Sequence, residues 1–161
     1  MELAPGALIG VLNDVFSRID ELAERHGVEK IRNTGDNWMG VSGVPCARLD
    51  HAQTAMRMAL DVRDFVECYR TPDGRSLAVR IGLNSGPLVA GVIGKHKFGY
   101  DIWSDTVNTA SRMESQGVAG RVHVSEATYA LMKDEFVFED RGAINVRGRG
   151  PLNTYFVLAA R

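Results

Sequence analysis

The sequence is poor in cysteine, in long apolar runs and in excess charge of either sign. Its 161 residues include two cysteines, Cys46 and Cys68, without the CxxC spacing of a zinc site or redox pair. Two isolated thiols fit a reducing compartment better than a disulfide framework, so we expect a cytoplasmic protein. No run of 18 apolar residues occurs, which predicts no membrane segment. The net charge of −1 offers no basic excess for nucleic acid.

The common glycine-rich phosphate loops are also missing. Residues 80–99 read "RIGLNSGPLVAGVIGKHKFG", in which Lys95 follows Gly94 as in a P-loop. However, Val89 stands where the P-loop needs its first glycine, and His96 stands where it needs serine or threonine. The "RGRG" of residues 147–150 lacks the third glycine and the strand-to-helix context of a dinucleotide site. Most glycines here are therefore expected in turns and close backbone contacts.

Apolar residues make up 45% of the chain, enough for one domain with a hydrophobic core. Their spacing predicts alternating helices and strands without repeats or linkers, and therefore a single α+β domain. The expected elements are a helix over 8–26, a hairpin turning at 35–36, a helix over 50–69, strands over 77–83 and 87–94, a helix from 105, a strand over 121–125, a helix capped at 125, and a strand-rich end.

The stretch "KFGYDIWSDTVNTASRME", residues 97–114, holds the most specific candidate site. Asn108 and Arg112 are four residues apart, so a helix places them side by side. A solvated pair on a helix surface is the simplest interpretation. We favour a functional face, because Val107 and Ala110 are expected to point the opposite way and Asp101 lies just upstream.

Asp36 follows Gly35 in the predicted hairpin turn. Aspartate at such a position is usually a turn residue, because its carboxylate bonds the nearby backbone. The alternative is a metal ligand at the edge of a sheet, since hard divalent cations prefer carboxylate oxygens. The residues of the turn leave both interpretations open.

Together, "TGDNWM", "SGVP", "GPLVAGVIGKHKFGYDIWSDTVNTASRMES" and "RGAINVRGRGPLNTYFV" resemble the signatures of the class III nucleotidyl cyclase catalytic domain. The resemblance runs in order over nearly the whole chain. It implies a ferredoxin-like α+β fold, with helices packed on a mixed or antiparallel sheet. It also implies conversion of ATP to cyclic AMP and pyrophosphate, because Asp101 is typical of the adenylate-type enzymes.

The resemblance implies a role for each matching residue. Arg112 would stabilise the phosphate in the transition state, and Asn108 would orient the ribose. Asp101 would accept from the adenine amino group, beside Arg32 at the position of a base-reading lysine. Arg147 would reach the terminal phosphates, where arginine keeps the charge and adds a second donor.

The family uses two divalent ions, Mg²⁺ or Mn²⁺, and Asp36 matches the second of its two metal-binding aspartates. Its sites form across a head-to-tail homodimer, so the expected partners are ATP, a second copy or a longer cyclase chain, with no nucleic acid. The first aspartate belongs to a strand like "FADIVGFT", which has no counterpart in residues 1–161. We therefore expect a single cyclase domain that lacks this first strand and the following helix.

Two other functions compete with an active adenylate cyclase. One is an inactive pseudo-cyclase that only dimerises or binds nucleotide, which the absent aspartate favours. The other is a plain protein-interaction module of the same fold. Such a module has no reason to keep Asn108 and Arg112, so we rank it below the first two.

Overall fold

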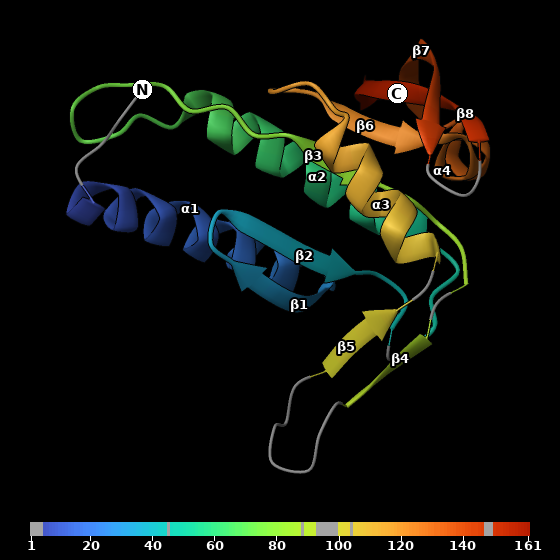
Figure 1. The fold of residues 1–161 in the computed structure, drawn as a ribbon, viewed down its shortest axis with the longest axis horizontal. Coiled ribbons are helices and arrows are strands. Elements are labelled where there is room, and N and C mark those ends of the chain that lie inside the picture. Colours follow the sequence, from blue (N-terminus) through green and yellow to red (C-terminus); the bar gives the residue numbers. More distant parts are fainter. Residues whose placement is uncertain (1–4, 45, 88, 93–99, 104, 147–149) are drawn as a thin grey trace.

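The structure, a computed structural model, describes residues 5–44, 46–87, 89–92, 100–103, 105–146 and 150–161, with backbone only for 89–92 and 100–103. The helices described are α1 (Pro5–His26), α2 (His51–Cys68), α3 (Asp105–Ser115) and α4 (Glu126–Met132). The strands are β1 (Glu29–Thr34), β2 (Asn37–Val41), β3 (Ile81–Leu83), β4 (Val89–Val92), β5 (Tyr100–Trp103), β6 (Val122–Ser125), β7 (Phe136–Val146) and β8 (Gly150–Ala160) (Figure 1). This confirms the α+β class.

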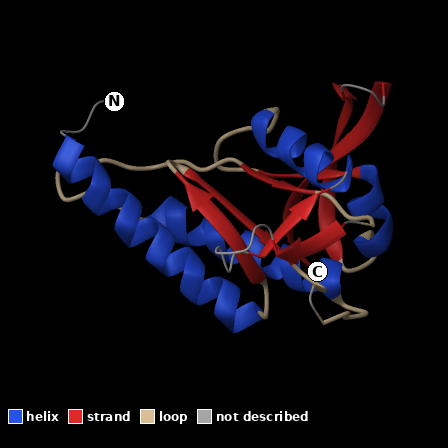
Figure 2. Cartoon of the chain, turned by 60° about the horizontal axis from the view of Figure 1, so that its bottom comes forward, coloured by secondary structure: helices blue, strands red, loops and turns tan. Residues whose placement is uncertain are grey.

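The described strands form three separate sheets. β3, β6, β8 and β7 make a four-stranded mixed sheet in that order, in which only the β3–β6 pair is parallel. β1 pairs with β2 in one antiparallel hairpin, and β4 pairs with β5 in another. Figure 1 labels the strands of each group, and Figure 2 shows the strands (red) and helices (blue) from another side.

The helix limits agree with the apolar spacing of the sequence. α1 ends at His26, before Gly27, whose φ of 71° favours glycine over any residue with a Cβ. α4 begins after Ser125, whose hydroxyl accepts a hydrogen bond from the Thr128 backbone N–H. Within the described residues, no helix combines the length and apolar character needed to cross a bilayer.

The predicted strand over 77–83 is too long by four residues. Regular pairing begins only at Ile81, because its partner strand β6 begins at Val122. Before that point, the Val79 carbonyl accepts a hydrogen bond from the Gly120 backbone N–H, which lies outside β6. A strand needs a neighbour for its backbone groups, so alternation of side chains alone overestimates its length.

The core consists of two clusters that share α2. Met56 and Leu60 pack with Val122, Val124 and Phe136 over the four-stranded sheet. The other cluster joins α2 to α1 and is built from Val11, Val15, Ile19, Leu22, Ala23, Met58, Val62 and Val66. Ile81 touches both clusters, so β3 lies at their junction.

Candidate active site

Helix α3 presents Asn108 and Arg112, and its inner face fixes where they lie. Thr109 and Met113 are 1% and 0% exposed, whereas Asn108 and Arg112 are exposed. The helix packs on β3 at Gly82, where an added Cβ would lie 2.1 Å from the Glu114 backbone nitrogen. The absence of a side chain at Gly82 therefore allows this close packing.

The expected orientation of Ala110 was wrong, whereas Val107 does not line the cavity. Both are only partly buried, and Ala110 lines the same cavity as Asn108 and Arg112. The buried stripe of α3 is formed by Thr109 and Met113 instead. Thr109 and Met113 each follow a site residue directly in sequence. The helix therefore places Asn108 and Arg112 on an exposed face, next to the buried face of Thr109 and Met113.

One cavity of about 750 Å³ brings three of the predicted site residues together. Asp36 lines it from the β1–β2 turn, and Asn108 and Arg112 line it from α3. Within the described part of the chain, none of these three side chains makes a hydrogen bond or ion pair. A carboxylate, an amide and a guanidinium are thus left available to a polar ligand.

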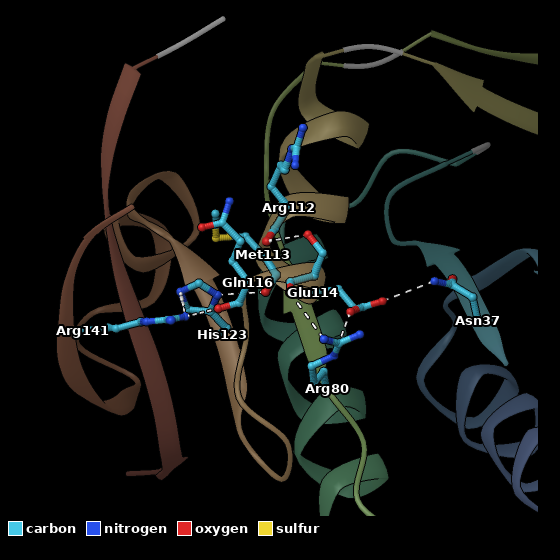
Figure 3. A network of polar contacts seen from close by, with 9 residues as sticks. Asn37, Arg80, Arg112, Met113, Glu114, Gln116, His123 and Arg141 are labelled. Atoms are coloured by element: carbon cyan, nitrogen blue, oxygen red, sulfur yellow. Dashed lines mark hydrogen bonds and ion pairs between the residues drawn. The ribbon is translucent and has the colours of Figure 1, made fainter. Parts of the chain in front are cut away.

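The neighbouring polar groups, in contrast, are engaged. Glu114 accepts a 3.3 Å hydrogen bond from the Asn37 side-chain amide and forms a 3.2 Å ion pair with Arg80. Figure 3 shows Glu114 between these two residues, while the Arg112 guanidinium points away from the network. Glu114 therefore connects α3 to the hairpin that carries Asp36, a role that the sequence analysis missed because the partners lie 77 residues apart.

A buried histidine supports α3 from the side of the sheet. His123 in β6 is 0% exposed, and its Nδ1 lies 2.8 Å from the Met113 carbonyl oxygen. Its Nε2 lies 3.3 Å from Nη1 of Arg141 (Figure 3). Burial lowers the pKa of His123, against the opposing effect of the Met113 carbonyl. A neutral ring that donates from Nδ1 and accepts at Nε2 satisfies both contacts.

The other predicted site residues are not placed in this cavity. Arg32 is exposed in β1, opposite Met39, and does not line the cavity. Asp101 pairs with Gly91 between β5 and β4, and the position of its side chain lies outside the described structure. Arg147 falls outside the described residues altogether.

The chemistry of the cavity suits a divalent ion only together with a nucleotide. Within the described residues, no group of three or more His, Cys, Asp or Glu side chains could hold a metal ion. Mg²⁺ is commonly bound by one or two carboxylates plus substrate phosphates, and keeps several waters. Asp36 can supply one such carboxylate, so the residues fit a metal that arrives with phosphate ligands.

Comparison with known proteins identifies the family. The model of the adenylate and guanylate cyclase catalytic domain matches residues 1–159. The chain is 43% identical to an adenylate cyclase of Mycobacterium bovis over 158 residues, which are 98% of this chain and 36% of that protein. The chain therefore spans about a third of the length of this relative.

Solved structures show the same fold. The guanylate cyclase domain of RhGC from Catenaria anguillulae, in complex with GTP, has a TM-score of 0.94 and 39% identity, over 99% of this chain and 88% of that one. The adenylyl cyclase CyaB from P. aeruginosa has a TM-score of 0.92 and 30% identity, over 99% and 86%. The similarity thus extends to adenylate and guanylate cyclases alike. The chain belongs to the class III nucleotidyl cyclase catalytic domains.

Proposed function

We propose that this domain is of the adenylate type and forms cyclic AMP and pyrophosphate from ATP, for cyclic nucleotide signalling. The observation that carries the proposal is the set of unengaged polar side chains: the Asp36 carboxylate in the β1–β2 turn, and the Asn108 amide and Arg112 guanidinium on α3, none of which is bonded within the described chain. The 43% identity to an adenylate cyclase supports it. Guanylate cyclases are among the relatives of similar identity. Sequence identity alone therefore does not choose between ATP and GTP as the substrate.

In this proposal the 3′-oxygen of the ribose attacks the α-phosphorus, and the bond from that phosphorus to the pyrophosphate oxygen breaks. Charge grows on the α-phosphate oxygens, where the planar fork of Arg112 can donate two hydrogen bonds. Asn108, one turn earlier on α3, can fix the ribose by its amide. Asp36 would hold the divalent ion, which neutralises phosphate charge and favours loss of the 3′-hydroxyl proton.

The base and the terminal phosphates would be bound by residues from other elements. We assign Asp101 and Arg32 to the adenine and Arg147 to the terminal phosphates, on the family resemblance. A solved guanylyl cyclase core with converted specificity, in complex with ATPαS, is 41% identical to this chain. The specificity of a related core has thus been converted, and guanylate cyclase activity is the second candidate that the assay must include.

Within one chain these three residues line a single cavity. We further propose, on the family resemblance, that the reaction instead takes place between two copies, where Asp36 of one copy meets Asn108 and Arg112 of the other. Asp36→Ala and Arg112→Ala are each expected to abolish cyclic AMP formation. Mixed in equal amounts, they should recover about a quarter of wild-type activity, because half of the random dimers hold one intact site of two. Asp134→Ala and Arg57→Ala are matched controls, since both residues are exposed and neither lines the cavity.

If a single chain holds a whole site, the mixture stays inactive while each variant remains folded. The isolated 161-residue chain is expected to be a weak enzyme, since it offers one metal aspartate by resemblance. Loss of one such electrostatic element costs on the order of 10²–10³ in rate. A chain that binds ATP without any Mn²⁺-dependent product would instead support the pseudo-cyclase alternative. The cytoplasmic location stays a prediction from the isolated thiols.

A further inference from the structure

The C-terminal end of α3 is bound to the four-stranded sheet by side chains. A helix leaves its last carbonyl groups without partners of its own. Here the Met113 carbonyl oxygen lies 2.8 Å from Nδ1 of His123 in β6. The Gln116 carbonyl, one residue past the helix, accepts a hydrogen bond from Nη1 of Arg141 in β7. Figure 3 shows His123 and Arg141 on one side of this turn, while Arg112 points away from them.

Two guanidinium groups lie at this end of the helix, and their partners differ. Nη1 of Arg80 lies 3.4 Å from the Ser115 carbonyl oxygen, but Arg80 also forms the ion pair with Glu114. Arg141 has no carboxylate within ion-pair distance among the described residues. Its guanidinium, although exposed, is bound to a carbonyl and an imidazole only. A cation is favourable here, because the helix dipole places partial negative charge at the C-terminus.

A second arginine on the same face of the sheet has no such contact with α3. Cζ of Arg121 lies 4.1 Å from the centroid of the Phe156 ring, and its Nη2 forms a 3.0 Å ion pair with Glu139. Cζ of Arg141 lies 5.3 Å from the same centroid. The two arginines thus share a ring, and within the described residues only Arg141 donates to the end of α3.

The contact between Arg141 and α3 requires a neutral His123. Nε2 of the imidazole lies 3.3 Å from Nη1 of Arg141, and a guanidinium can only donate, so Nε2 must accept. A protonated ring donates from both nitrogens and repels Arg141, while its bond to the Met113 carbonyl can persist. Loss of Arg141 from this position also removes the donor to Gln116.

The other groups around His123 do not offset its protonation. Phe156 pairs with it across β8, Glu139 pairs with Phe156 from β7, and Gly82 pairs with it across β3. The only carboxylate in this row, Glu139, is bound to Arg121. From α3 the Met113 carbonyl faces the ring. An imidazolium here would therefore stand between two arginines without a free acid.

We propose that Arg141 is a positioning residue for the nucleotide reaction: through the Gln116 carbonyl and neutral His123 it fixes the last turn of α3, and with it Arg112. The inference rests on the proposed function of Arg112. Arg112 lies in this last turn, and the ends of helices fray. A guanidinium that moves with a fraying turn leaves the α-phosphate, and a misplacement of about 1 Å can cost on the order of 10²-fold in rate.

Substitution of Arg141 tests this in the Mn²⁺-dependent cyclase assay. Arg141→Gln should lower kcat about ten- to hundredfold and change KM by less than about twofold, because Arg112 acts on charge that grows in the transition state. Arg141→Lys keeps the charge and one donor, so its kcat should lie between those of wild type and Arg141→Gln. Arg121→Gln is the matched control and should keep the wild-type kcat, since its partner is Glu139.

Two further measurements do not need activity. The Gln116 and Gly117 amides donate to carbonyls of the last turn, so their hydrogen exchange reports its opening. Exchange should be about tenfold faster in Arg141→Gln than in wild type or Arg121→Gln, with the α1 amides unchanged. Burial lowers the pKa of His123 most, and the positive charge of Arg141 lowers it further. The NMR titration of His123 should therefore move to higher pH in Arg141→Gln.

Equal exchange of the Gln116 and Gly117 amides in Arg141→Gln and wild type would overturn the inference. Faster exchange with an unchanged kcat would overturn it too, as would an equal loss of kcat in Arg121→Gln. A wild-type chain that makes no cyclic nucleotide would contradict the proposed function instead. The exchange data then still decide the role of Arg141, because faster exchange supports it and equal exchange rejects it.

Discussion

Single residues in this chain divide into those held by their neighbours and those left available. Glu114 accepts a hydrogen bond from Asn37 and forms an ion pair with Arg80, and these contacts position α3 against the hairpin. The side chain of Arg112, two residues before Glu114, makes no hydrogen bond or ion pair within the described residues. Arginine that is free of structural partners beside a positioned helix is suited to bind phosphate, since nothing must be broken first.

Base choice is the first prediction at this scale. A carboxylate at Asp101 can accept from the adenine amino group, but would face the O6 acceptor of guanine. Binding of ATP should therefore exceed that of GTP by about tenfold, corresponding to ~1.4 kcal/mol. Asp101→Ala should erode this preference in calorimetry with unreactive analogues, and Asp134→Ala should not. Equal affinity for both nucleotides, unchanged by Asp101→Ala, would remove Asp101 from this role.

His123 predicts a pH dependence of stability. Burial holds its pKa in the folded chain below the ordinary value of 6.5. Below pH 6.5 the unfolded chain binds a proton that the folded chain resists, so the free energy of unfolding falls as the pH falls. The slope for one proton reaches at most about 1.4 kcal/mol per pH unit.

Urea unfolding between pH 7.5 and 5 measures this slope. His123→Gln should remove the contribution, and the difference between the two chains isolates it from the carboxylates. His51→Gln is the matched control, because His51 is a partly buried histidine outside the α3 contacts. The interpretation fails if wild type and His123→Gln lose stability in parallel over this range.

At the scale of elements, the contact between α3 and β3 decides where Asn108 and Arg112 lie. A methyl group at Gly82 would collide with backbone atoms of Met113 and Glu114, which cannot rotate away. Overpacking of this kind costs about 1–3 kcal/mol. Gly82→Ala should therefore lower the free energy of unfolding by about that amount and reduce cyclase activity, since Asn108 and Arg112 move with α3.

Gly10→Ala provides the matched control for this substitution. Gly10 lies inside α1, and a Cβ there meets no atom within 4 Å. Alanine in an open helical position stabilises by roughly 0.5–1 kcal/mol relative to glycine. Denaturant unfolding should thus show opposite signs for the two glycines. The same sign for both would mean that α3 is not held by close contact at Gly82.

For the whole molecule, the division of the strands into separate sheets predicts weak cooperativity. The two core clusters meet at α2 and Ile81. Among the described strands, none pairs with both β2 and β3. The isolated chain should therefore unfold with a van't Hoff enthalpy below its calorimetric enthalpy, or associate through its open edges. Calorimetry and light scattering at several concentrations measure both. A monomer with a sharp, full-enthalpy transition would contradict this expectation.

Much of the fold follows from local pattern. The apolar spacing of α1 and α2, the Gly35–Asp36 turn and the Ser125 cap depend on residues close in sequence, and all are observed. Asn108 and Arg112 share a helix surface for the same reason, because four residues make about one turn. The family resemblance, confirmed by the match over residues 1–159, added the chemistry that local pattern cannot give.

The sequence by itself thus determined the helices, the α+β class and the placement of Asn108 and Arg112 on one surface of a helix. Only the tertiary structure decided where β3 starts, which face of α3 is buried, and which polar side chains are already engaged. Each of these depends on partners far along the chain: β6 for β3, Gly82 and His123 for α3, and Asn37 for Glu114. Backbone pairing and close packing are contacts between distant segments, so the spacing of residues within one segment cannot specify them.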